Sequence, residues 1–231
     1  MMRLKGLRSQ LLCAVTALCL FVPFSLADPL GKKSILRQQY EPIISSISKQ
    51  LLVNHEIFKK DPSAYQAFLN QYVRPYWDVS STSRALIGGK NFTVLDKHHQ
   101  LKLVDAVDKT LVRYAFEGIN FYSGQQFTLV DMAISDSGKM GWVQVVIKSK
   151  ILPDLNLDIL VKRNNEGNWT AVDVRFKGMT YVAVKKYQFK NILEKQGVGA
   201  LITSLNEKNN KFFSELCVTA DKVNKVDKQF C

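Results

Sequence analysis

The residues of this chain that could bind a metal are few and poorly spaced for it. It has 3 histidines in 231 residues. His98 and His99 are adjacent, and adjacent side chains on a helix point about 100° apart, so the two rings cannot hold one ion together. His55 stands alone. Because the sequence also lacks C-x-x-C and H-E-x-x-H patterns, it predicts no metal site and no cofactor.

Two acids in strand-like segments, Asp131 and Asp173, are the remaining candidates for catalysis. Each could act as a general acid or base in a cavity over a sheet. Each also lies between apolar neighbours, which places it on the opposite face of its strand, so solvent exposure or a local hydrogen bond is the favoured interpretation. Gly88-Gly89-Lys90 lacks the spacing of a phosphate-binding loop, and no G-x-S-x-G is present. We therefore expect a protein that is not an enzyme.

The first 27 residues are typical of a secretory signal peptide. Met1–Arg8 is basic without an acid, Leu11–Phe24 is almost wholly apolar, and Ser25-Leu26-Ala27 places small residues at a cleavage site. An uncleaved anchor is the alternative, but fourteen residues are short for a bilayer. We expect cleavage after Ala27 and export.

The remaining chain, 28–231, has the composition of a soluble globular protein, as one domain or two small ones. The whole chain is 46% hydrophobic and carries a net charge of +12, of which +9 remains without the signal peptide. The lysines are scattered rather than clustered with aromatics, so nucleic acid is not an expected partner. A weak attraction to anionic lipid surfaces is the most that this charge supports.

Two cysteines, Cys217 and Cys231, remain after export. An even pair in an oxidising compartment predicts one disulfide, which would stabilise the C-terminal tail by roughly 3 kcal/mol. Two free thiols are the alternative.

Hydrophobic periodicity divides the mature chain into a helical part, about 34–122, a strand part, about 126–177, and C-terminal helices, about 186–208. Residues 209–231 are left as a tail. Predicted helices cover 34–58, where Pro42 bends the helix or marks its start, then a helix that Asp61-Pro62 opens, 80–87, 93–122, 187–195 and 198–206. A break of 93–122 at Gly118 is the alternative for the long helix.

From Phe127 onward the hydrophobic period is 2, and turns fall at 136–139, 153–154 and 164–168. This pattern predicts a four-stranded antiparallel meander with one apolar face, covered by helices in an α+β fold. Such a face can close into an ordinary core or leave a deep apolar pocket. Composition alone favours the ordinary core. By strand parity its inward residues are Val130, Met132, Val143, Val145, Leu157, Ile159, Val172 and Val174.

A set of motifs runs along the mature chain in a fixed order: Pro75 and Asp78, Gly88, Gly167-Asn168-Trp169, Asp173-Val174, Gly178, Gln188-Phe189, Ile192-Leu193, Gly197, Leu201 and Leu205. In this order and spacing the sequence resembles the MlaC family of periplasmic phospholipid-binding proteins, the toluene-tolerance (Ttg2-type) auxiliary transport proteins. The resemblance covers about Ile35 to Lys208. The chain departs from it at Thr180, at Val184-Lys185-Lys186 with Tyr187 inserted after them, and in the tail from Phe212.

The resemblance implies a cystatin-like or NTF2-like sheet packed against a helical subdomain, with a cavity between them for phospholipid tails. It implies a periplasmic carrier whose only bound molecule is its phospholipid cargo. Its partners would be an outer-membrane lipoprotein/porin complex and an inner-membrane ABC transporter complex with a membrane-anchored lipid-binding subunit. Two ~16-carbon tails represent roughly 25 kcal/mol of transfer from water, so such a carrier needs an apolar cavity that matches the bilayer.

On this view the eight inward strand residues contact the acyl chains, and Val107, Leu111 and Ile119 supply the opposite wall. An aspartate in place of Val145 is expected to abolish lipid co-purification. Two other hypotheses stay open: a small-molecule enzyme on an NTF2-like cavity, and an exported structural or interaction domain with a filled core.

Overall fold

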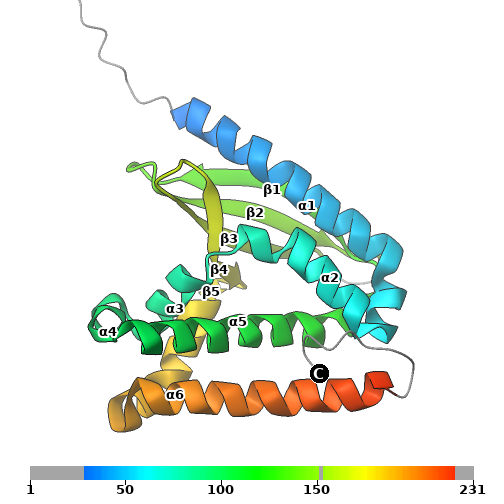
Figure 1. Ribbon diagram of the computed structural model, residues 1–231. Coiled ribbons are helices and arrows are strands. Elements are labelled where there is room, and N and C mark those ends of the chain that lie inside the picture. Colours follow the sequence, from blue (N-terminus) through cyan, green and yellow to red (C-terminus); the bar gives the residue numbers. More distant parts are fainter. Residues whose placement is uncertain (1–28, 151–152, 222–231) are drawn as a thin grey trace, which may run out of the picture.

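The chain forms a sheet layer with a long helix across it and a second layer made of helices (Figure 1). The computed structural model describes residues 29–150 and 153–221. The helices are α1 (Pro29–Lys60), α2 (Pro62–Tyr72), α3 (Val79–Ile87), α4 (Gly89–Val94), α5 (Lys97–Ile119) and α6 (Tyr181–Asp221), with one 3-10 turn, η1 (Arg74–Tyr76). The strands are β1 (Gln126–Ile134), β2 (Met140–Lys148), β3 (Leu155–Arg163), β4 (Trp169–Phe176) and β5 (Met179–Thr180).

The five strands pair in sequence order as one antiparallel meander, which confirms the predicted α+β fold. The fifth strand was not expected, because it has only two residues. It pairs with β4 through a tight turn at Lys177 and Gly178, whose φ angles are 49° and 81°. A two-residue hairpin of this kind requires positive φ at both central positions, which glycine adopts without strain.

Three aspartates set where helices begin. Asp61, Asp78 and Asp96 are the N-caps of α2, α3 and α5, and their carboxylates accept backbone hydrogen bonds from Ala64, Ser81 and His99. Because Asp96 caps α5, the long helix begins at Lys97 rather than at residue 93, and the preceding residues form the separate helix α4. The helix runs on to Ile119 without the alternative break at Gly118.

Helix α1 contacts both layers. Leu36, Tyr40 and Ile44 pack on the sheet, whereas Leu51 and Phe58 pack among α2, α5 and α6. The helix continues through Pro42 and starts thirteen residues before it, so this proline is not the helix start. A third core, centred on Leu103 and Leu201, joins α3, α4, α5 and α6.

The two layers are also joined at β4. The segment before α3 docks on this strand, since the amide of Asp78 donates to the carbonyl of Ala171 at 2.8 Å. In the first turn of α3, the Thr82 hydroxyl donates to the carbonyl of Val172 at 2.7 Å. Val172 is the unpaired residue of a strand irregularity, and β5 pairs with β4 only at Arg175 and Phe176, so this stretch of the outer edge of β4 is open to the segment before α3.

Helix α6 bends at Gly197, where φ is 79°, as the glycine between two predicted helices suggested. Its second segment continues to Asp221, well beyond residue 208. Asn209 in that extension is fully buried, and it exchanges hydrogen bonds with Thr110 of α5 at 3.1 and 3.2 Å. The residues directly after 208 are therefore part of the helical core, not a tail.

Two predictions lie outside the described residues. One is the signal peptide over 1–27. The other is the Cys217–Cys231 disulfide, since the structure describes neither Cys231 nor the side chain of Cys217. None of the described helices has the length and apolar character that crossing a membrane requires.

Candidate functional site: the apolar face of the sheet

One face of the sheet carries a continuous row of apolar side chains across all five strands. Leu129 pairs with Val145, Val145 with Leu157, Leu157 with Phe176, and Phe176 with Met179. Burial falls along this row: Val145 is 1% exposed, Leu157 is half-buried, Phe176 is 40% exposed and Met179 is 64% exposed. The face is thus closed at Val145, half-buried at Leu129 on the edge strand β1, and opens progressively from β3 towards β5.

Helix α1 closes the first part of this face. Its residues Leu36, Tyr40 and Ile44 form one buried cluster with Met132, Val143, Val145, Val161 and Trp169. Polar contacts fix the helix there: the Gln39 side chain donates to the carbonyl of Trp169 at 2.7 Å and accepts from its amide at 3.2 Å. At the surface, Lys33 pairs with Asp131 at 2.8 Å.

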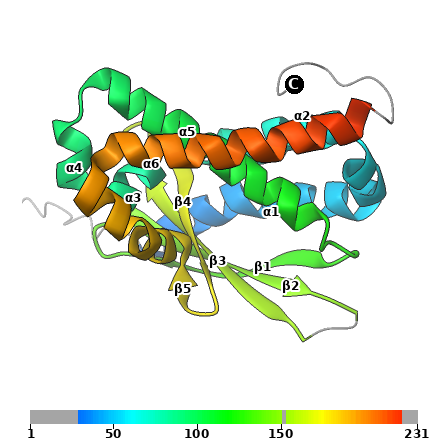
Figure 2. The ribbon, with the colours of Figure 1, turned by 90° about the horizontal axis from the view of Figure 1, so that it is seen from below.

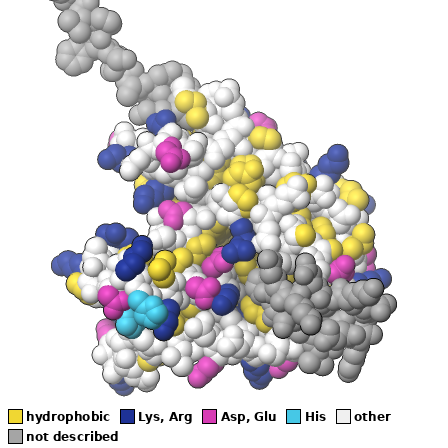
Figure 3. All heavy atoms as spheres, viewed as in Figure 1, with side chains coloured by type: hydrophobic (Ala, Val, Ile, Leu, Met, Phe, Trp, Pro, Cys, Tyr) yellow, Lys and Arg dark blue, Asp and Glu magenta, His cyan; other side chains and the backbone are white. Residues whose placement is uncertain are grey.

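The open part of the face lies on β3 and β4. Ile159 pairs with Val174 in the row next to Leu157, and all three side chains are half-buried. Figure 3 shows hydrophobic side chains in the recess between the sheet layer and the helical layer with α4 and α5. Apolar surface of this kind, left partly uncovered beside a filled core, is typical of a binding site.

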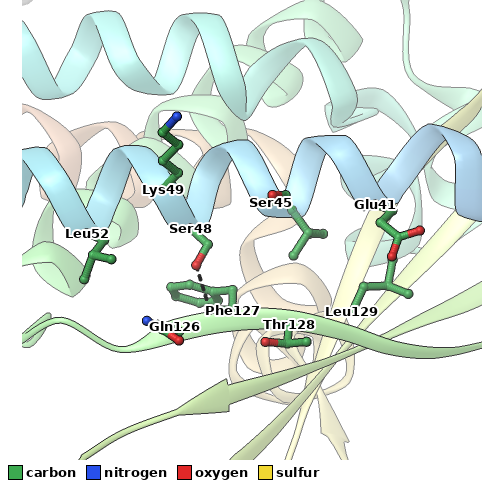
Figure 4. Close-up of a pocket in the computed structure, with 10 residues that line it drawn as sticks. Glu41, Ser45, Ser48, Lys49, Leu52, Gln126, Phe127, Thr128 and Leu129 are labelled. Atoms are coloured by element: carbon green, nitrogen blue, oxygen red, sulfur yellow. Dashed lines mark hydrogen bonds between the residues drawn. The ribbon is translucent and has the colours of Figure 1, made fainter.

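A pocket of about 400 Å³ lies between α1 and β1, at the other end of the same face (Figure 4). Its apolar lining comes from Ile44, Leu52, Phe127 and Leu129. Its polar lining comes from Glu41, Ser45, Ser48, Lys49, Gln126 and Thr128. Four of the ten lining residues are apolar and six are polar, so the pocket offers apolar contact beside a polar, charged rim.

One hydrogen bond crosses this pocket. The amide of Phe127 donates to the hydroxyl of Ser48 at 2.9 Å and ties the middle of α1 to the edge strand β1 (Figure 4). Phe127 packs against both the sheet core and the helical core. It therefore marks the place where the apolar face meets the helical layer.

The structure corrects the prediction for Val130. The register of β1 shifts between Leu129 and Asp131, so Val130 is the extra residue of a bulge and is 47% exposed. Because a bulge reverses strand parity, Leu129 and Met132 share the inner face. Asp131 is exposed as predicted, and its hydrogen bond with Lys33 lowers its pKa.

A second register shift, between Ala171 and Asp173, changes which residues of β4 lie on the inner face. Val174 lies opposite Ile159 on the same face, next to the apolar row, but Val172 is the unpaired residue at the irregularity, buried beside the docked α3 segment. Asp173 is buried, and its carboxylate accepts from the amides of Val174 and Val182 at 2.8 and 3.1 Å. Burial raises the pKa of Asp173, and these hydrogen bonds oppose the rise. Of the two interpretations offered for Asp173, solvent exposure and a local hydrogen bond, the structure shows the local hydrogen bond.

The three residues expected in the opposite wall lie in helix packing. Val107 and Leu111 belong to the core that α3, α4, α5 and α6 share, and Ile119 belongs to the core of α1, α2, α5 and α6. Of the strand residues, Met132, Val143 and Val145 are fully buried under α1, and Leu157, Ile159 and Val174 form the open part. The structure therefore does not bring the eight strand residues and the three helix residues together as the two walls of one cavity.

Four apolar residues of the pocket were not predicted: Ile44, Leu52, Phe127 and Leu129. Ile44, Ser48 and Leu52 follow one another at helical spacing, which identifies them as one face of α1 but not as a face that leaves a gap. Leu129 was assigned outward because no sequence signal marks the bulge. Among the described residues there is also no cluster of His, Cys, Asp and Glu that could hold a metal ion.

Comparisons with known proteins agree with this fold. The profile of the MlaC protein family matches residues 43–207. A solved structure, the phospholipid-binding protein from Ralstonia solanacearum in complex with a phospholipid, has a TM-score of 0.63 at 16% sequence identity. That similarity covers 78% of this chain and 98% of the other. No curated protein matches the sequence. Because the profile spans most of the chain, including the whole sheet, the protein belongs to the MlaC family.

Proposed function

We propose that this protein is a phospholipid carrier that holds acyl chains against the apolar face of its sheet. The observation that carries the proposal is the open end of the apolar row, where Leu157, Phe176 and Met179 continue a face that α1 otherwise covers. Support also comes from the related fold from Ralstonia solanacearum, whose structure contains a phospholipid. No catalytic step is assigned to it.

The size of the pocket between α1 and β1 supports an arrangement in which the two acyl chains of one phospholipid lie at different places on the apolar face. If a methylene takes roughly the 30 Å³ of a water molecule, two 16-carbon tails need about 960 Å³. The pocket has about 400 Å³, which suits most of one tail. In this proposal a second tail lies along the half-buried residues Leu157, Ile159 and Val174, and the head group stays near solvent.

We further propose that the carrier works in the periplasm, between an outer-membrane lipoprotein/porin complex and an inner-membrane ABC transporter complex. The basic start, apolar run and Ser25-Leu26-Ala27 of the sequence support export, and the family supports the transport role. The intact mass of the protein from a periplasmic extract tests the first part. A chain that begins at Asp28 is expected.

Transfer of a fluorescent phospholipid between vesicles tests the carrier role. Donor vesicles contain a self-quenched labelled phosphatidylglycerol, and acceptor vesicles contain none. The mature protein is expected to raise the rate of dequenching in proportion to its concentration. A rate equal to that of vesicles alone, with the protein shown to be folded, would contradict the proposal.

A further inference from the structure

The β4–β5 hairpin and the first turns of α6 form a surface that begins at the open end of the apolar row and continues beyond it. We call it the hairpin–helix surface; it comprises Phe176, Lys177, Met179, Val184, Lys186, Tyr187 and Lys190. The hairpin leads directly into α6, and the two lie next to each other at one edge of the molecule (Figure 2).

This surface exposes large apolar side chains. Tyr187 is 83% exposed and Met179 is 64% exposed, with Phe176 beside Met179 as its cross-strand partner. Val184 precedes Tyr187 by three residues, so the two share one side of α6. Scattered exposed apolar residues need no explanation, but four of them on one hairpin and the adjoining helical turns indicate a contact surface.

The same surface has a strongly one-sided charge. Lys177, Lys186 and Lys190 lie on it, and Lys185 lies beside it, with its ammonium 4.9 Å from the centre of the Tyr114 ring. No Asp or Glu occurs between Asp173, which is buried, and Glu194. The next acid along the sequence, the exposed Glu194, lies at the border of the surface and pairs with Lys190 at 4.0 Å.

We propose that the hairpin–helix surface docks the protein on an anionic phospholipid membrane surface. Lysines attract anionic head groups, while tyrosine, methionine and phenylalanine insert at the boundary between head groups and acyl chains. Either signal alone gives weak binding, and this surface combines both. An acidic protein surface would satisfy the lysines, but it would leave Tyr187 and Met179 without an apolar partner.

The position of the surface supports this occupant. Met179 and Phe176 are the exposed end of the apolar row that begins under α1. A membrane in contact with them would lie at the open end of that row.

Co-sedimentation with vesicles tests the proposal, using the full mature protein. Vesicles of phosphatidylethanolamine and phosphatidylglycerol, 3:1, are compared with vesicles of phosphatidylcholine alone. The test variant combines K177N, K186Q and K190Q, where asparagine tolerates the positive φ of residue 177. Wild type is expected to bind the anionic vesicles, and the variant to bind them on the order of 100-fold more weakly.

A matched control removes three exposed lysines from α4 and α5, as K90Q, K97Q and K102Q. Binding within threefold of wild type is expected, since the net charge falls equally but the hairpin–helix surface is intact. Y187S is expected to weaken binding about tenfold at every salt concentration, because it removes apolar contact and no charge.

Two results would overturn the proposal. Equal losses in the two triple variants would assign binding to net charge rather than to this surface. If the wild-type protein binds neither kind of vesicle, the surface does not dock on membranes, and an acidic protein becomes the partner that its lysines indicate. Neither result depends on whether the protein carries phospholipid, because vesicle binding is measured without transfer.

Discussion

Val145 and Leu157 are cross-strand partners on one face of the sheet, yet Val145 is sealed under α1 and Leu157 is half-buried. At this level of the sheet the boundary between the core and the open face therefore runs between β2 and β3, whereas farther along the strands Val161 of β3 and Trp169 of β4 lie in the core under α1. Residues on the Val145 side of this boundary hold the fold together. Residues on the Leu157 side are available to a ligand.

This boundary determines which substitution tests lipid binding. An aspartate at position 145 would bury a charge in the sheet core and unfold the protein, so lipid loss in that variant would carry no information. Leu157→Asp is expected to remove co-purified phospholipid while the protein stays folded, because the charge reaches solvent but repels acyl chains.

Val146→Asp is the matched control for Leu157→Asp. It changes a half-buried apolar residue of the neighbouring strand that points to the opposite face, where its cross-strand partners are the polar residues Thr128 and Asn156. Lipid content is measured by solvent extraction, and folding by circular dichroism. Equal lipid content in the two variants would contradict the assignment of the open face.

The bulge in β1 predicts a difference between two neighbouring apolar residues. Met132→Ala is expected to lower the free energy of unfolding by about 2–5 kcal/mol, because it leaves a cavity in the core under α1. Val130→Ala should cost less than about 1 kcal/mol, because that side chain is largely exposed. Guanidinium unfolding of both variants checks this, and similar costs would mean that strand parity continues through Val130.

Asp173 predicts a pH-dependent term in stability. Burial raises its pKa in the folded protein above the ordinary 3.8, so the folded state holds the proton more tightly than the unfolded state. Its contribution to stability is then complete below pH 3.8 and is lost as the pH rises through the folded pKa.

Asp173→Asn keeps an oxygen that accepts from the amides of Val174 and Val182, but it cannot ionise. We expect this variant to gain stability relative to wild type as the pH rises from about 4 to 7. Asp173→Ala, which loses the acceptor, should be less stable by about 1–3 kcal/mol. Melting temperatures across this range measure both effects, and a pH-independent difference between wild type and Asp173→Asn would refute the shift.

Asn209 tests whether the end of α6 belongs to the core. Its amide donates to the carbonyl of Ala106 at 3.0 Å, and its oxygen accepts from the guanidinium of Arg113 at 3.1 Å. Asn209→Ala leaves these buried groups unpaired and is expected to cost about 2–4 kcal/mol. Asn210→Ala, at the exposed next position, should change stability by less than about 0.5 kcal/mol; equal costs would place this end of α6 outside the cooperative fold.

Much of the fold could be predicted from the sequence, because its signals are local. The period of 2 after Phe127 identified the meander, Asp61-Pro62 identified the start of α2, and Gly197 identified the bend in α6. These signals act within a few residues of the structure they specify.

The candidate site was harder to predict, because it depends on two register shifts and on where α1 lies. A bulge reverses strand parity from its position onward. Val130 and Val172 are valines like the regularly paired valines of the same sheet, so the sequence does not mark them as bulge residues. The helical spacing of the apolar residues in α1 does not tell whether this helix covers the whole apolar face of the sheet or only part of it. Only the tertiary arrangement shows that β1 and β2 are covered and β3 and β4 are partly open.

Native mass spectrometry of the purified mature protein, followed by solvent extraction, tests the central claim most directly. The account predicts one diacyl phospholipid per chain, lost in Leu157→Asp and retained in Val146→Asp. A protein that carries no lipid, and takes up none when incubated with phosphatidylglycerol or phosphatidylethanolamine, would contradict it. Its place in the MlaC family would then describe the fold alone.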